Sequence, residues 1–340
     1  MTSLSDETID HLLQVSTLPD LAATKYEVLE TLGSGGMGTV FLARDRELQR
    51  EVALKVVASM AMGPGTIDRL SSEARILAHL EHPGIVPIHD LGRLPDGRLF
   101  YVMKRVKGSR LDEHARQLES TADALRLFER ICEPVAFAHA GGVIHRDLKP
   151  ENVMVGPFGE VLVMDWGVAR FGLQSADSIE LDSGQPEISR QTAAGAILGT
   201  PGYMAPEQAG GAADLDERAD IYALGAILRF LLTGEAPPIA GEAGGHRAHP
   251  PDTRRWSGGI PRPLEAICRK AMAIRPDNRY SSVPEMSAEV ARFLTGGRVL
   301  AYPESVLERA RRFTARHRTA IVLIAVYLAV RLSLILWRRS

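Results

Sequence analysis

Apolar and polar positions alternate along the first third of the chain in a way that predicts a sheet. Between residues 26 and 105, five runs alternate or are rich in β-branched residues, and glycine or charged residues separate them. Such runs are typical of half-buried strands. In residues 67–80 the apolar side chains instead recur every three or four positions, until Pro83 and Gly84 end the run. We therefore expect five strands with one helix inserted after the third.

Beyond Gly108 the apolar period changes to that of helices, which we expect over residues 125–140, 220–232, 264–274 and 283–294. Polar residues fill 171–198, and proline and glycine crowd 235–259, as in exposed loops. A strand-rich small lobe followed by a helix-rich large lobe predicts an α+β fold with a cleft between the lobes. We divide the chain into a polar leader (1–25), a small lobe (26–105), a large lobe (106–297), a basic segment (298–319) and an apolar helix (320–337).

Composition and charge exclude few classes beyond nucleic-acid binding. The chain is 45% hydrophobic and 24% charged, with a formal net charge of -2, as expected of a globular protein without a nucleic-acid partner. Cys132 and Cys268 stand far apart without a CxxC pair, which predicts two buried thiols in a reducing compartment. The leader has acidic residues where a secretory signal has basic ones, so we expect the bulk of the chain in the cytoplasm.

The C-terminal apolar run predicts a membrane anchor. Residues 320–337 read AIVLIAVYLAVRLSLILW, and arginines flank the run on both sides. Eighteen helical residues span about 27 Å, close to the hydrocarbon thickness of a bilayer. Arg331 opposes insertion by roughly 3 kcal/mol, but the surrounding leucine, isoleucine and valine residues outweigh it. The heavier arginine cluster precedes the run, which predicts attachment to the inner membrane with the N-terminal bulk on the cytoplasmic side. An amphipathic or core-packed helix is the alternative.

A glycine-rich stretch carries the first chemical signal. Gly33, Gly35, Gly38 and Val40 form a G-x-G-x-x-G-x-V pattern that continues as a strand. Glycine allows backbone amides to approach phosphate oxygens because no Cβ intervenes. The same spacing also occurs in dinucleotide-binding folds and in plain hairpins, so this motif alone is weak.

A lysine on an apolar strand strengthens the phosphate reading. Lys55 lies in the run VALK, where an unpaired ammonium would be costly. Nucleotide phosphates would supply anions, and Glu73 in the predicted helix 67–80 is the natural carboxylate partner. Alternatively, Glu73 is an ordinary solvent-exposed residue of that helix.

Two further motifs resemble those of a known family. Residues 143–155 read VIHRDLKPENVMV, and residues 164–167 read MDWG. Together with the earlier motifs, and in this order, they resemble the catalytic loop and metal-binding motif of eukaryotic-type (Hanks-type) serine/threonine protein kinases, including their bacterial relatives, over about residues 26–297. The resemblance implies the bilobal kinase fold and transfer of the ATP γ-phosphate to serine or threonine hydroxyls of proteins.

The resemblance also implies a role for each motif residue. Asp147 would orient the substrate hydroxyl, Lys149 would reach the γ-phosphate, and Lys55 paired with Glu73 would fix the α- and β-phosphates. Asn152 and Asp165 would ligate Mg²⁺, with Mn²⁺ as an alternative ion. The implied ATP contacts are Leu32, Gly33, Ser34, Gly35, Gly36, Met37, Gly38, Val40, Ala53, Lys55, Met103, Lys104, Val106 and Met154.

Other positions are implied to be structural or regulatory. Residues 199–207 read GTPGYMAPE, like the end of a kinase activation segment, in which Thr200 would contact the catalytic loop. The implied structural residues are Glu207 paired with Arg279, and Asp220 beneath the catalytic loop. Arg146, beside the catalytic aspartate, suits a phosphothreonine. We expect autophosphorylation through a transient dimer, first at Thr192 and less at Thr200.

Two departures from the family pattern and two alternatives remain. Trp166 stands where the family usually has phenylalanine, and Lys104 follows the gatekeeper Met103 where an acidic residue is usual.

A pseudokinase scaffold would not need the base and both metal ligands together. A small-molecule kinase would not need the GTPGYMAPE run. Both alternatives therefore fit less well than an active protein kinase.

Overall fold

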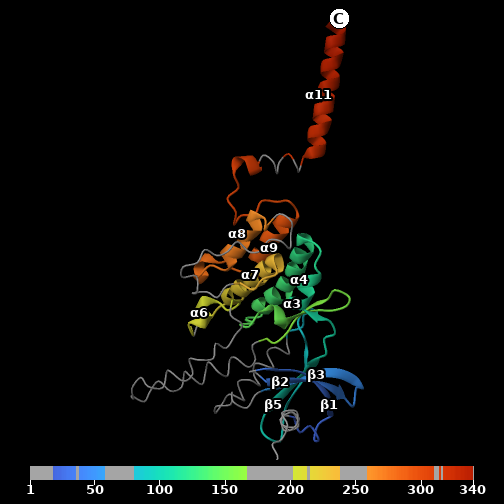
Figure 1. Cartoon of the computed structure of the whole chain (residues 1–340), viewed down its shortest axis with the longest axis vertical. Helices are drawn as coiled ribbons and strands as arrows, with labels where there is room; N and C mark the ends of the chain where they lie inside the picture. Colours follow the sequence, from blue (N-terminus) through green and yellow to red (C-terminus); the bar gives the residue numbers. More distant parts are fainter. Residues whose placement is uncertain are drawn as a thin grey trace, which may run out of the picture.

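A computed structural model of the chain describes residues 18–35, 38–57, 80–166, 202–212, 215–237, 259–309, 314 and 317–339. Two lobes are visible in Figure 1: a twisted sheet forms one, and a bundle of helices forms the other. The helix predicted over 67–80 and the polar segment 171–198 lie outside the described residues, except for Leu80.

The small lobe is an antiparallel sheet with strand order β1-β2-β3-β5-β4. Its strands are β1 (Tyr26–Gly35), β2 (Gly38–Asp45), β3 (Arg50–Val57), β4 (Ile88–Arg93) and β5 (Leu99–Lys104). All five predicted strands are present. Pro87 cannot donate a ladder hydrogen bond, and β4 begins one residue later.

The two faces of this sheet have different tasks because side chains alternate along a strand. Val52, Leu54 and Val56 of β3 pack in an apolar cluster on one face. Ala53 and Val57 belong to a second cluster that includes Leu162 of the large lobe. Lys55 has the same parity as Ala53 and Val57, so it points toward the large lobe.

The large lobe is built around a helix that is apolar on nearly every side. This helix, α7 (Arg218–Thr233), buries residues that include Ile221, Leu224, Ile227 and Leu231, as expected for a helix at the centre of a core. The helices are α3 (Leu111–His114), α4 (Thr121–Ala140), α6 (Pro206–Ala209), α7 (Arg218–Thr233), α8 (Arg262–Ala271) and α9 (Val283–Leu294). Short 3₁₀ turns cover Ala115–Gln117, Pro150–Asn152 and Pro276–Asn278.

Caps explain where the long helices begin and end. The hydroxyl of Ser120 accepts a hydrogen bond from the Asp123 amide at the start of α4, and Ser282 does the same for Glu285 at the start of α9. Gly234 ends α7 with a φ of 78°, the left-handed conformation that glycine adopts easily. All four helices predicted for this lobe are present, and the predicted span 283–294 is that of α9.

A three-stranded sheet joins the lobes at the cleft. It consists of β6 (Ser109–Arg110), β7 (Val153–Val155) and β8 (Val161–Val163) in that order. Ile85, which precedes β4, forms an isolated parallel bridge with Val163 of β8. The segment between α4 and β7 is therefore fixed at both ends, and it contains the predicted catalytic loop.

The C-terminal helix α11 (Arg318–Arg339) stands away from both lobes (Figure 1). In the part of the chain that the structure describes, no helix has both the length and the apolar character needed to cross a lipid bilayer. The predicted membrane-spanning helix over 320–337 is therefore not confirmed. Arg331 lies within α11 and interrupts its apolar residues.

Candidate active site

Lys55 and Asp165, from different lobes, meet in the cleft. The Lys55 ammonium donates a hydrogen bond of 2.8 Å to a carboxylate oxygen of Asp165. The lysine side chain is only 8% exposed. Burial lowers the pKa of Lys55, but nearby Tyr101 and the Asp165 carboxylate outweigh burial and raise the pKa above its usual value. Lys55 is therefore a fixed cation at neutral pH.

The catalytic loop places three polar side chains within contact of one another. Lys149 lies 3.2 Å from a carboxylate oxygen of Asp147. The side-chain amide of Asn152 donates to the Asp147 carbonyl at 2.7 Å and faces its carboxylate at 3.4 Å. A carboxylate, a cation and an amide thus share one small volume, as phosphoryl transfer requires.

The strand end that carries Asp165 packs directly on this loop. The backbone amide of Met164 donates to the Asn152 carbonyl at 2.8 Å, and the buried His145 ring contacts the Met164 carbonyl at 2.8 Å. Arg146 and Asp165 have φ angles of 63° and 55°, uncommon for residues with a side chain. Such backbone strain gathers at functional sites, where the surrounding structure enforces it.

Trp166 fits the position at which the family usually has phenylalanine. Its ring is buried, and its centroid lies 4.7 Å from that of His145. The indole N–H donates to the Val163 carbonyl at 3.2 Å, so the extra polar group has a partner. The substitution therefore adds a hydrogen bond next to Asp165 without opening the core.

Asp220 supports the catalytic loop from below. Its carboxylate accepts hydrogen bonds from the amides of His145 (2.7 Å) and Arg146 (2.8 Å), and it contacts the His139 ring at 2.8 Å. Burial raises the pKa of Asp220, but these partners, His139 above all, outweigh burial and hold it below the usual value. The buried carboxylate is thus ionised and fixes the loop that presents Asp147.

This depressed pKa predicts a pH-dependent contribution to stability. Because the unfolded chain binds the proton more readily, Asp220 stabilises the fold above its ordinary pKa of 3.8, and the contribution is lost as pH falls further. We expect Asp220→Asn to be less stable than the native chain at neutral pH, with the difference shrinking as pH falls from about 5 to about 3. Urea unfolding across this range measures the difference. A difference independent of pH would contradict this assignment.

Most residues that the family resemblance implies for the adenine ring share one apolar cluster. Val40, Ala53, Met103 and Val106 belong to this cluster between the lobes, and Ala53 pairs with Met103 across the sheet. The Lys104 amide donates to the Pro87 carbonyl at 3.2 Å, and the Lys104 side chain is exposed. Met154 is half-buried on β7, opposite Leu162.

The glycines of the first hairpin serve two different purposes. A Cβ at Gly33 or Gly35 would meet nothing within 4 Å, which leaves room for a ligand above β1. Gly38 has a φ of 131°, and a Cβ there would lie 2.0 Å from the Val56 carbonyl oxygen. Gly38 is thus required by the close approach of β3, a reason that the motif does not reveal. Leu32 and Ser34 are exposed on β1, and Gly36 and Met37 lie outside the described residues.

The residues present suit a magnesium ion held jointly with phosphates. The side-chain N–H of Asn152 donates to the Asp147 carbonyl, so the side-chain oxygen of Asn152 remains available as a neutral hard ligand. Asp165 supplies a carboxylate. The described residues include no cluster of three or more His, Cys, Asp or Glu side chains able to bind a metal.

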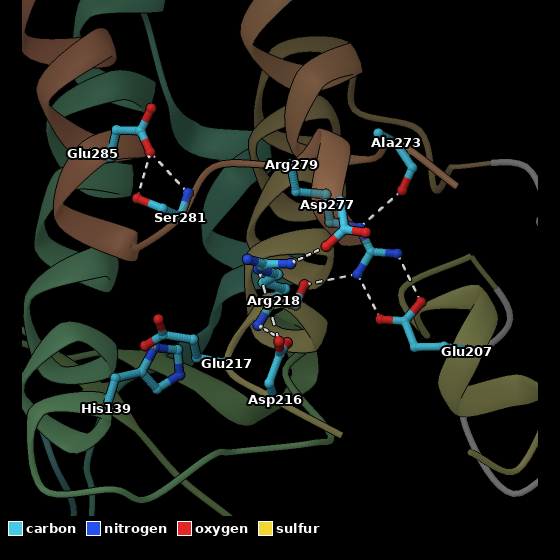
Figure 2. A network of polar contacts seen from close by, with 10 residues as sticks. All are labelled: His139, Glu207, Asp216, Glu217, Arg218, Ala273, Asp277, Arg279, Ser281 and Glu285. Atoms are coloured by element: carbon cyan, nitrogen blue, oxygen red, sulfur yellow. Dashed lines mark hydrogen bonds and ion pairs between the residues drawn. The ribbon is translucent and has the colours of Figure 1, made fainter. Parts of the chain in front are cut away.

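The Glu207–Arg279 pair joins α6 to the base of the large lobe. The guanidinium binds both carboxylate oxygens, at 2.6 and 2.7 Å. Figure 2 shows Arg279 between Glu207 and the carbonyls of Ala273 and Arg218, which it also contacts at 2.8 and 2.9 Å. Its side chain has no exposed area, and it lies 5.1 Å from the Tyr222 ring centroid. Every donor of this buried cation thus faces an acceptor or a ring.

The structure brings together Lys55, Asp147, Lys149, Asn152 and Asp165, whereas Glu73, Thr192 and Thr200 lie outside the described residues. Two contacts were not foreseen. Gln208 donates to the Arg146 carbonyl at 2.5 Å, and Tyr101 faces Lys55 across the sheet. Tyr101 and Met103 are two residues apart on one strand, so their side chains lie on the same face of the sheet. Only the pairing register of β3 and β5 places Tyr101 opposite Lys55.

Comparison with known proteins agrees with this architecture. The lobes, and the cleft between them, have the arrangement of a protein kinase. Residues 26–288 match the model of the protein kinase domain, and the chain therefore belongs to this family. The kinase domain of PknI from Mycobacterium tuberculosis superimposes with a TM-score of 0.58 at 27% identity, covering 79% of this chain and 96% of that one. The predicted fold class is confirmed.

The curated relatives are bacterial serine/threonine protein kinases. PknB of Mycobacterium tuberculosis is 38% identical over 82% of this chain and 44% of its own length. PknD of Protochlamydia amoebophila is 36% identical over 80% of this chain and 30% of its own length. The chain thus carries a kinase domain of the bacterial serine/threonine type, although it spans less than half the length of these relatives. Protein kinases use ATP and a divalent metal.

Proposed function

We propose that the chain is an active serine/threonine protein kinase that transfers the ATP γ-phosphate to protein hydroxyls. The observation that supports it most is the 2.8 Å contact between Lys55 and Asp165 in a cleft that also contains Asp147. A lysine two positions after the aspartate, as Lys149 is, favours serine and threonine over tyrosine substrates. A pseudokinase scaffold would not need all of these groups.

Each side chain has a physical task in this reaction. Lys55 binds the α- and β-phosphates, and Asp147 orients the attacking hydroxyl toward the γ-phosphorus and receives its proton. Lys149, 3.2 Å from Asp147, offsets the charge that develops on the transferred group. Asn152 and Asp165 would ligate Mg²⁺, which when bound neutralises phosphate charge. Reaction is promoted by positioning and charge rather than by a covalent intermediate.

The test is Mg²⁺-dependent transfer of labelled phosphate from ATP to casein and to the chain itself. We expect transfer by the native chain and none above background by Lys55→Met or Asp147→Asn. Lys270→Met and Asp277→Asn, the same changes at partly or fully exposed positions of the large lobe, serve as controls and should remain active. Mg-ATP binding without any transfer by the native chain would instead favour the scaffold.

We also propose that the kinase phosphorylates its own activation segment through a transient dimer. The sequence supports Thr192 first and Thr200 second, since both precede the GTPGYMAPE end of that segment and Arg146 lies in the adjacent loop. Mass spectrometry of active protein should find phosphate on one of them, and Asp147→Asn protein should lack it. Fully active protein without phosphate between residues 189 and 200 would contradict the proposal.

We propose, finally, that α11 attaches the kinase domain to the inner membrane from the cytoplasm, where ATP is available. The support is local: residues 321–331 are all exposed, among them Leu323, Val326 and Val330. Residues on every side of one helix therefore present apolar area to the surroundings, which a lipid phase would cover. The basic residues before the helix suit anionic headgroups.

Cell fractionation tests the attachment. The full chain should pellet with membranes, and a chain ending at residue 319 should be soluble and equally active toward casein. Extraction at alkaline pH then separates the two modes, because a helix embedded in the bilayer is retained and a helix on its surface is released. Recovery of the full chain in the soluble fraction would contradict attachment of either kind.

A further inference from the structure

Tyr101 lies directly beside the nucleotide-binding lysine although it belongs to none of the kinase motifs. It is the third residue of β5, and the strand register pairs it with Lys55 of β3. Paired residues in an antiparallel sheet project from the same face, here the face of the cleft. The Lys55 ammonium lies 6.0 Å from the centroid of the Tyr101 ring.

The tyrosine ring is fixed in place by its surroundings. Tyr101 is 7% exposed and packs in the apolar cluster that contains Ala53, Met103 and Leu162. It also lines a hollow behind Met103 with Asp165 and Trp166. An aliphatic side chain would fill this space equally well, and a buried hydroxyl is costly unless it has a polar partner. The charged group that the Tyr101 side chain faces is the Lys55 ammonium, and Tyr101 contributes to the raised pKa of this lysine.

A further partner for Lys55, beside the Glu73 carboxylate that the family resemblance implies, matters because Asp165 has two tasks. In the present structure the Asp165 carboxylate accepts the hydrogen bond of the ammonium. In the proposed function the same carboxylate ligates the metal, which draws its charge away from Lys55. We propose that Tyr101 is a positioning residue, whose hydroxyl keeps the Lys55 ammonium on the cleft side of β3, aimed at the nucleotide phosphates, when Asp165 turns to the metal. This inference rests on the proposed nucleotide site.

Removal of the hydroxyl alone tests the inference. Tyr101→Phe keeps the ring and its packing. It should weaken Mg-ATP binding by about tenfold, the size expected for one hydrogen bond to a charged group, and raise KM for ATP in proportion. The KM for casein should stay within about twofold. Tyr26→Phe is the matched control, because Tyr26 is also buried in the small lobe and its hydroxyl donates to Asp90 at 2.7 Å. The control should lower Tm but leave KM for ATP unchanged.

A double-mutant cycle shows whether Tyr101 acts through Lys55. Calorimetric titration with Mg-ATP is done on the native chain, Tyr101→Phe, Lys55→Met and the double variant. In the Lys55→Met background, loss of the hydroxyl should change affinity by less than about twofold. Equal losses in both backgrounds would mean that the hydroxyl does not act on the lysine, and no loss in the native background would mean that it has only a packing role. Either result overturns the inference.

The Lys55→Met and Tyr101→Phe variants together test the role of Tyr101 separately from the nucleotide site. Should Lys55→Met itself leave Mg-ATP affinity and phosphate transfer unchanged, the nucleotide site is misplaced and both proposals fall. Should Lys55→Met abolish transfer while Tyr101→Phe matches the native chain, only the role of Tyr101 falls.

Discussion

Asp165→Asn is expected to lower kcat at least about 10³-fold while the protein stays folded, which corresponds to about 4 kcal/mol of lost transition-state stabilisation. The amide has the shape of the carboxylate but no negative charge. It therefore loses both the ion pair with Lys55 and the charged ligand proposed for Mg²⁺. Steady-state kinetics with saturating Mg-ATP and casein measure the effect, and circular dichroism checks the fold.

The control for this change is Asp277→Asn. Asp277 is exposed and pairs with Arg218, and in the part of the chain that the structure describes it forms no ion pair with a proposed catalytic residue, so kcat and KM should stay within about twofold of the native values. If Asp165→Asn retained more than about a tenth of native kcat in Mg²⁺, neither the metal role nor the charge role of Asp165 could stand.

Arg279→Met should reduce the free energy of unfolding by about 3–5 kcal/mol, the usual cost of removing one partner from a buried ion pair. The variant leaves the Glu207 carboxylate without its bidentate partner. It also frees the carbonyls of Ala273 and Arg218, which the guanidinium now satisfies. Urea unfolding measured by tryptophan fluorescence gives the difference.

Arg126→Met is the matched comparison, because it removes an arginine from an exposed pair with Asp123 in the same lobe. Such pairs contribute roughly 0–1 kcal/mol, so this variant should unfold close to the native midpoint. Similar losses for the two variants would mean that the burial of Arg279 does not govern its contribution.

The sequence by itself determined the fold class and pointed to the residues of the proposed site. Motifs such as the G-x-G-x-x-G-x-V stretch and the HRDLKPEN loop are local, because phosphate binding and phosphoryl transfer need particular residues at short spacings. The long helices were also predictable, since their apolar period lies within one segment. The membrane-spanning helix predicted over 320–337 was not confirmed among the residues that the structure describes.

Only the tertiary structure decided which groups meet across the sheet and between the lobes. The place of Tyr101 opposite Lys55 follows from the register of β3 and β5, and the need for glycine at Gly38 follows from the approach of the Val56 carbonyl. His139 contacts Asp220 from a helix far away in the sequence. Such contacts depend on how distant segments pack, and no periodicity within one segment encodes the distance between two side chains from different elements.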